Sequence, residues 1–67
     1  MLTNNTIGVI IKTLPNLMFK VKLDSNIEVV AGMLARLRLN KVRLLVGDRV
    51  LVQCHGNIGK IILRYKI

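Results

Sequence analysis

Four cationic side chains lie within eight positions of one stretch of the chain: Arg36, Arg38, Lys41 and Arg43. No acidic residue occurs in this stretch before Asp48. Such a cluster presents positive charge to the solvent and attracts polyanions. Guanidinium groups suit phosphate especially well because their planar fork engages two oxygens at once. A solvated loop that keeps the chain soluble is the alternative, but the absence of acidic partners favours a nucleic-acid contact surface.

The charge of the whole chain also points to a polyanionic partner. Its 67 residues include 11 Lys and Arg but 3 Asp and Glu, for a net charge of +8. Nucleic acid is the first candidate, and an acidic protein or an anionic membrane surface is the alternative. No uncharged run reaches the roughly 18–20 residues that a membrane-spanning helix needs. We therefore expect RNA, and no membrane, as the partner.

Catalysis and metal binding are not expected from the remaining reactive residues. The acids Asp24, Glu28 and Asp48 form no recognisable carboxylate pair, and no nucleophile stands beside a base. Cys54 and His55 are single residues of their type, whereas a metal site needs about four ligands. A lone cysteine cannot form an internal disulfide, which fits a reducing compartment. The sequence predicts no enzyme, no metal and no cofactor.

Five strand-like segments must position the cationic stretch. They cover residues 7–12, 18–23, 27–31, 49–54 and 60–66, and residues 1–5 form a loose lead-in. Ile7, Val9 and Ile11 share one face of the first segment. Alternation predicts these inward side chains in the others: Phe19, Val21, Leu23, Ile27, Val29, Ala31, Val50, Val52, Cys54, Ile61, Leu63 and Tyr65.

The longer connector between the third and fourth segments is ambiguous by pattern. Residues 35–39 alternate like a strand, but Ala, Leu and Arg are good helix formers. We predict a short helical turn there. The whole pattern predicts one all-β domain over residues 1–67, a five-stranded antiparallel OB-type barrel, with an SH3-like barrel as the alternative. Closure of the sheet removes the exposed strand edges of so small a protein.

Aromatic residues are scarce, which bears on how RNA is read. Phe19 and Tyr65 are the two aromatic residues, and alternation places both inward. Proteins that bind single strands stack bases on exposed aromatic rings. The chain is therefore predicted to recognise folded RNA by its shape and phosphates.

Three motifs give the chain a resemblance to a known family. Residues 14–19 read Leu-Pro-Asn-x-Met-Phe, and residues 43–48 read Arg-x-Leu-x-Gly-Asp. Gly-Lys-Ile-Ile follows at residues 59–62, before Arg64. With these motifs the chain, from about Gly8 to Lys66, resembles translation initiation factor one of bacteria and plastids.

The resemblance implies an OB fold and a monomer that binds the small ribosomal subunit at the aminoacyl-tRNA site during initiation. It implies support of the other initiation factors, exclusion of premature tRNA and no cofactor. The predicted ribosomal RNA contacts are Arg36, Arg38, Asn40, Lys41 and Arg43 of the connector, with Lys60, Arg64 and Lys66 of the last strand. The expected location is the plastid stroma, with the bacterial cytoplasm as the alternative. The alternative function is a basic OB or SH3-like barrel that binds RNA or an acidic protein without an initiation role.

Overall fold

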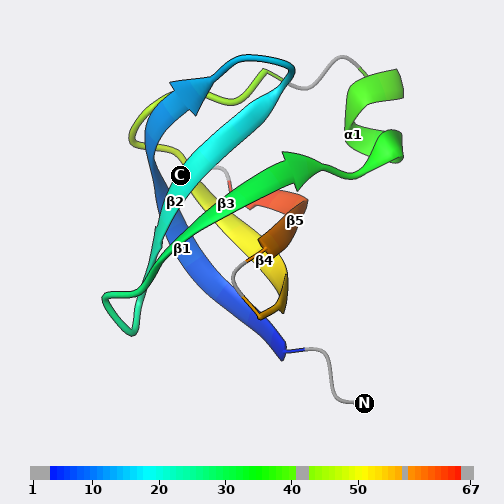
Figure 1. Cartoon of the computed structure of the whole chain (residues 1–67). Coiled ribbons are helices and arrows are strands. Elements are labelled where there is room, and N and C mark those ends of the chain that lie inside the picture. The colour runs from blue at the N-terminus through cyan, green and yellow to red at the C-terminus, as the bar shows by residue number, and fades with distance from the viewer. Residues whose placement is uncertain (1–3, 41–42, 57, 66–67) are drawn as a thin grey trace.

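The computed structural model describes residues 4–40, 43–56 and 58–65. Its elements are β1 (Asn4–Leu14), β2 (Met18–Leu23), β3 (Glu28–Met33), α1 (Ala35–Leu39), β4 (Arg49–His55) and β5 (Ile58–Tyr65). The strands close into a barrel in the order β1-β2-β3-β5-β4 (Figure 1). The predicted five-stranded barrel and the short helix between its third and fourth strands are confirmed.

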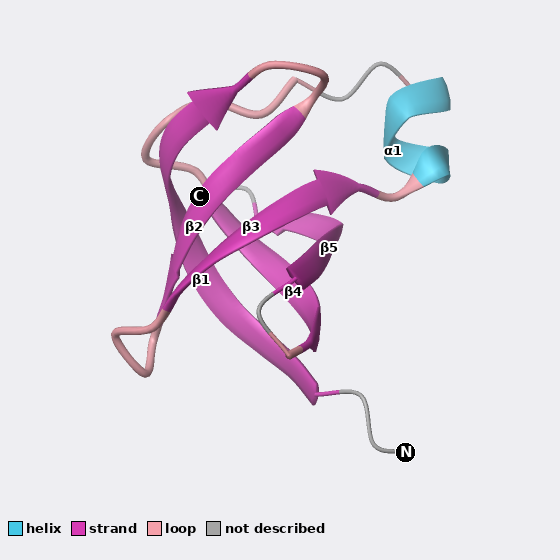
Figure 2. Ribbon diagram, in the orientation of Figure 1, coloured by secondary structure: helices cyan, strands magenta, loops and turns pink. Residues whose placement is uncertain are grey.

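The barrel is not antiparallel throughout, which corrects the prediction: four of the strand pairings are antiparallel, and the pairing of β3 with β5 is parallel. The parallel ladder runs from Val30 opposite Ile58 to Met33 opposite Ile61. A parallel pair needs a long crossover, which the connector and β4 supply here. As a result α1 begins directly beside β5, at the same end of the barrel as the β1–β2 turn (Figure 2).

Branched aliphatic side chains fill the barrel. Those that are fully buried are Ile10, Val21, Val50, Val52 and Ile61. The predicted inward positions of β2 are confirmed, and so are Val29 and Ala31 of β3 and Val50 and Val52 of β4. These strands have regular period-two alternation because one face packs on the core.

The face shared by Ile7, Val9 and Ile11 is the outer face of β1. Gly8 and Ile10 point into the barrel instead, and Ile11 is exposed. Glycine at position 8 is required by space, because a Cβ there would lie 2.6 Å from Val21 Cγ1. Because Ile and Val occur on both faces of β1, the sequence alone did not predict which face would point into the barrel.

Several predicted strand boundaries are wrong: β1 continues to Leu14, β3 to Met33 and β4 to His55, and β5 begins at Ile58. Residues 4 and 5 belong to β1, where Asn5 pairs with Gln53, because β4 is long enough to extend the ladder to this end. Ile27 precedes β3 and is 56% exposed, since the turn after β2 ends there. Cys54, predicted inward, is half-buried at the end of β4.

A β-bulge in β5 overturns two further inward assignments. Leu51 pairs with Leu63 but Val52 pairs with Ile61, which leaves Ile62 as an extra residue. An extra residue reverses the alternation beyond it. Leu63 and Tyr65 are therefore on the outside, 45% and 37% exposed, and Tyr65 is an accessible aromatic ring.

The Gly8→Ala substitution is expected to destabilise the barrel by about 1–3 kcal/mol through overpacking. Its new methyl group would lie 2.9 Å from the Lys22 carbonyl oxygen, which is held in the β1–β2 ladder. Urea unfolding measures the loss. Gly32→Ala is the matched control, because its nearest neighbour is the flexible Met18 sulfur at 3.3 Å. Equal losses for the two variants would contradict the steric explanation.

Candidate nucleic-acid interface

Helix α1 forms because Ala, Leu and Arg all favour helix, although Leu34 at its N-cap contributes no side-chain hydrogen bond. Leu37 is its buried residue and holds the helix against the barrel. Arg36 and Arg38 lie on either side of Leu37 along the chain and are both exposed. Because Leu37 faces the barrel, the side chains of Arg36 and Arg38 point to the solvent on either side of it.

The helix ends at Leu39, and its C-cap residue Asn40 donates its backbone N–H to the carbonyl oxygens of Arg36 and Arg38. Asn40 is exposed, so its side-chain amide is available for contact with a ligand. The two arginines also lie in the last turn of the helix, where cations interact favourably with its negative end.

The second half of the connector is anchored by a turn. The Asp48 carboxylate accepts the N–H of Leu45 at 2.9 Å, and Gly47 donates its N–H to the Ile10 carbonyl at 2.8 Å. Leu44 is buried in the core cluster. Arg43 thus projects, exposed, from a segment whose following residues are fixed to the barrel.

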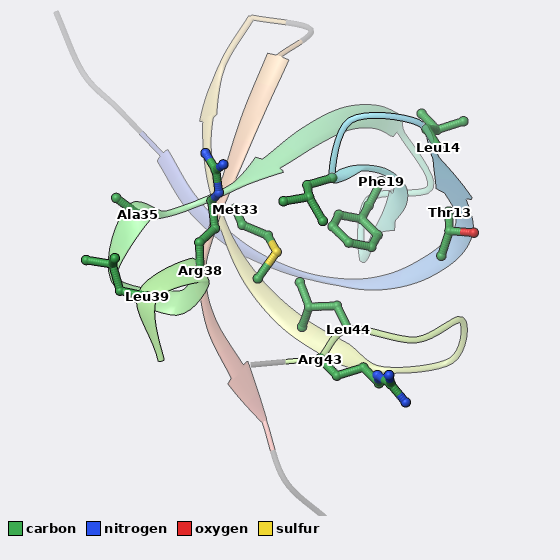
Figure 3. A pocket seen from close by; sticks show the side chains of 10 residues that line it. Thr13, Leu14, Phe19, Met33, Ala35, Arg38, Leu39, Arg43 and Leu44 are labelled. Carbon is green, nitrogen blue, oxygen red and sulfur yellow. The ribbon is translucent and has the colours of Figure 1, made fainter. Parts of the chain in front are cut away.

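An open groove of about 820 Å³ separates α1 from the β1–β2 hairpin. Its lining is Thr13, Leu14, Leu17, Phe19, Met33, Ala35, Arg38, Leu39, Arg43 and Leu44. In Figure 3 the Arg38 and Arg43 side chains lie on opposite sides of Met33 and point away from each other. The groove therefore has an apolar floor with a guanidinium group on each side.

Two of the three acidic side chains are engaged elsewhere. Glu28 pairs with Lys20 at 3.4 Å on the outer wall of β2 and β3, and Asp48 is used by the turn. In the part of the chain that the structure describes, no salt bridge involves a connector arginine. The net positive charge is therefore uncompensated around the groove.

The structure brings together only part of the predicted contact set. Arg38 and Arg43 line one groove, while Arg36 is on the other flank of Leu37. Lys60 is exposed on the outer wall, where its neighbours across the ladders are Gly32 and Gln53. Lys41 and Lys66 lie outside the described residues.

Arg64 is not an outward residue of β5, as alternation had placed it. The bulge at Ile62 sets it opposite the buried Val50, and it is half-buried. Its guanidinium Nη1 donates a hydrogen bond of 2.6 Å to the Arg43 carbonyl oxygen. The side chain therefore contacts the connector rather than projecting from the outer wall.

Sequence reasoning missed the apolar part of the groove. Leu17 and Leu39 are 51% and 81% exposed and come from opposite walls. Leu17 also has a positive φ of 58°, which is rare for a branched side chain. The one signal in the sequence was Leu39, an apolar residue within a cationic run.

The described residues hold neither a cluster of metal-ligating side chains nor a helix that could span a membrane. No three His, Cys, Asp or Glu side chains there gather closely enough to hold a metal ion. None of the helices in the described segments is long and apolar enough to cross a bilayer.

Cys54 is expected to react slowly with alkylating agents. Burial raises the pKa of its thiol above the usual range, so less thiolate is present at any given pH. At about pH 8.5, near the ordinary thiol pKa, iodoacetamide should modify the folded protein more slowly than the chain in guanidinium chloride. Mass spectrometry measures both rates, and equal rates would contradict the prediction.

The family of the chain follows from its similarity to known proteins. The sequence profile described as eIF-1a, Translation initiation factor 1A / IF-1, matches residues 2–67. The chain belongs to this family. Its members are translation initiation factors, which work with the ribosome and are not a class of enzyme.

Two solved structures resemble this member of the IF-1 family. Translation initiation factor one from the Wolbachia endosymbiont strain TRS of Brugia malayi has 33% sequence identity and a TM-score of 0.77. That match covers 96% of this chain and 79% of that chain. YjeQ from Thermotoga maritima has a TM-score of 0.82 at 20% identity, over 94% of this chain and 23% of that chain, and so shows the fold alone. The predicted family and the OB-type barrel are confirmed.

Proposed function

We propose that this protein binds the small ribosomal subunit at the aminoacyl-tRNA site through contacts with ribosomal RNA. The observation that carries the proposal is the groove at the α1 end of the barrel, where Arg38 and Arg43 are exposed and, among the described residues, form no salt bridge with an acidic side chain. Membership of a family of translation initiation factors supports the ribosome as the partner.

The proposed mechanism is recognition of folded RNA through phosphate oxygens. Arg36, Arg38 and Arg43 donate charged hydrogen bonds, each about twice as strong as a neutral one. Asn40, Lys41, Lys60 and Lys66 add polar and cationic contacts. The protein excludes premature tRNA by occupying its site, supports the other initiation factors and needs no cofactor.

Two residues differ from the mechanism expected from the sequence: Arg64 is left out of the phosphate contacts because it bonds to the connector backbone, and Tyr65 is exposed rather than inward. Its ring is 37% exposed on β5, so an aromatic surface for a base is available there. It is not among the residues that line the groove, whose own aromatic residue, Phe19, is 6% exposed. Recognition at the groove therefore depends on guanidinium groups and shape. For location we propose the plastid stroma, with the bacterial cytoplasm as the alternative.

Co-sedimentation tests the proposal. The protein should pellet with purified small subunits, much less with large subunits or anionic vesicles, and it should be displaced by tRNA bound at the aminoacyl site. Equal pelleting with all three would identify a non-specific basic protein. Simultaneous binding with that tRNA would show that the small-subunit site is a different one.

A further inference from the structure

Strand β5 holds both ends of the segment that carries the arginines. At one end the Leu34 N–H donates to the Ile61 carbonyl at 2.9 Å. At the other end the Arg64 guanidinium donates to the Arg43 carbonyl at 2.6 Å. The two β5 residues are three positions apart, and α1 lies in the segment between the two attachment points.

The bulge at Ile62 allows the hydrogen bond between Arg64 and the Arg43 carbonyl oxygen to form. Residues directly opposite each other in a ladder share a face of the sheet. Val50, opposite Arg64, is fully buried, so Arg64 is directed toward the inner side of the sheet. Without the extra residue, Arg64 would take the outer face and could not reach the Arg43 carbonyl.

We propose that Arg64 is a positioning residue, whose hydrogen bond fixes the connector backbone so that the Arg43 side chain is held ready for RNA. This inference rests on the proposed function, because RNA is the ligand that Arg43 contacts. Arg43 is exposed, and in Figure 3 its side chain extends away from Met33. Fixing its backbone before binding lowers the ordering cost of the complex. Arg64 itself contacts no phosphate.

A double-mutant cycle separates this role from a direct RNA contact. Arg64→Gln should weaken binding to purified small subunits about tenfold, as expected for one charged hydrogen bond. In an Arg43→Gln background it should weaken binding far less, because the side chain that it positions is gone. The matched control is Arg49→Gln, an exposed arginine on the adjacent strand, whose effect should be the same in both backgrounds.

The salt dependence of binding gives a second readout. Arg43→Gln should reduce the slope of log K against log salt by about 0.7–0.9, the value for one phosphate contact. Arg64→Gln should leave that slope unchanged although it lowers affinity. A reduced slope together with additive effects in the cycle would overturn the proposal and make Arg64 a phosphate ligand.

A measurement on the protein alone keeps this test independent of RNA binding. The Arg43 carbonyl and the Leu44 amide belong to one peptide group, so loss of the Arg64 hydrogen bond should shift the Leu44 amide nitrogen resonance. Arg49→Gln should not shift it. If the Leu44 signal of Arg64→Gln did not shift, the hydrogen bond between Arg64 and the connector would be refuted. If the signal shifted but the native protein did not bind small subunits, only the proposed function would be refuted. Should Arg64→Gln not fold, Arg64→Lys, with the charge but not the planar fork, is measured in the same way.

Discussion

Replacing Arg36, Arg38 and Arg43 together by glutamine is expected to lower the affinity for small ribosomal subunits by about 1,000-fold or more. A hydrogen bond to a charged group contributes about 1.5–3 kcal/mol, and three are removed. The slope of log K against log salt, about −3.5 to −4.5 for five phosphates, should become shallower by two to three units. Fluorescence anisotropy over a series of salt concentrations measures both quantities.

The matched control for this variant removes the same charge from the barrel wall. Lys12, Lys22 and Arg49 are exposed, and none of the three lines the groove. Their triple replacement by glutamine should reduce affinity only by the loss of non-specific attraction. If the two triple variants lost affinity equally, net charge rather than the connector would determine binding. A parallel loss of thermal stability in the connector variant would make its arginines structural.

Substitution of Ile61 by alanine is expected to unfold the isolated protein. Ile61 is fully buried, and removal of such a side chain costs about 2–5 kcal/mol. A single core in a domain below about 70–80 residues rarely supplies more than about 3–5 kcal/mol in total. Circular dichroism during heating should show no cooperative transition for Ile61→Ala.

Ile58→Ala is the control for that loss. It removes the same atoms from the same strand, but Ile58 is 67% exposed. Its stability should stay within about 0.5 kcal/mol of the native protein, as is usual for surface positions. A cooperative transition in Ile61→Ala at nearly the native temperature would show that the core is less dependent on this side chain than its burial indicates.

The strands could be predicted because their causes are local. In β2, Phe19, Val21 and Leu23 alternate with more polar positions, so the sequence alone predicts which face of the strand packs on the core. Asn26 and Gly47 adopt positive φ in turns, a conformation that Asn and Gly favour, so these turns also have local causes. The helical turn of α1 followed from propensity, and the resemblance supplied the family.

The faces of β1 and β5 and the groove could not be predicted in the same way. Apolar residues occupy both faces of β1, so only packing against Val21 selected Gly8 and Ile10 as the inner pair. Leu17 and Leu39 line the same groove because two segments that are distant in the sequence fold to one end of the barrel.

By itself, the sequence determined a small basic β-barrel with a cationic connector, because alternation, propensity and charge are properties of neighbouring residues, and its motifs supplied the resemblance to the IF-1 family. Only the tertiary structure decided the direction and the hydrogen-bond partner of the Arg64 side chain. The extra residue Ile62, which alternation does not predict, moves Arg64 to the other face of β5. There its guanidinium group donates to the Arg43 carbonyl oxygen. The physical reason is that the position of a bulge depends on how β4 and β5 pair around the closed sheet, and no single strand contains that information.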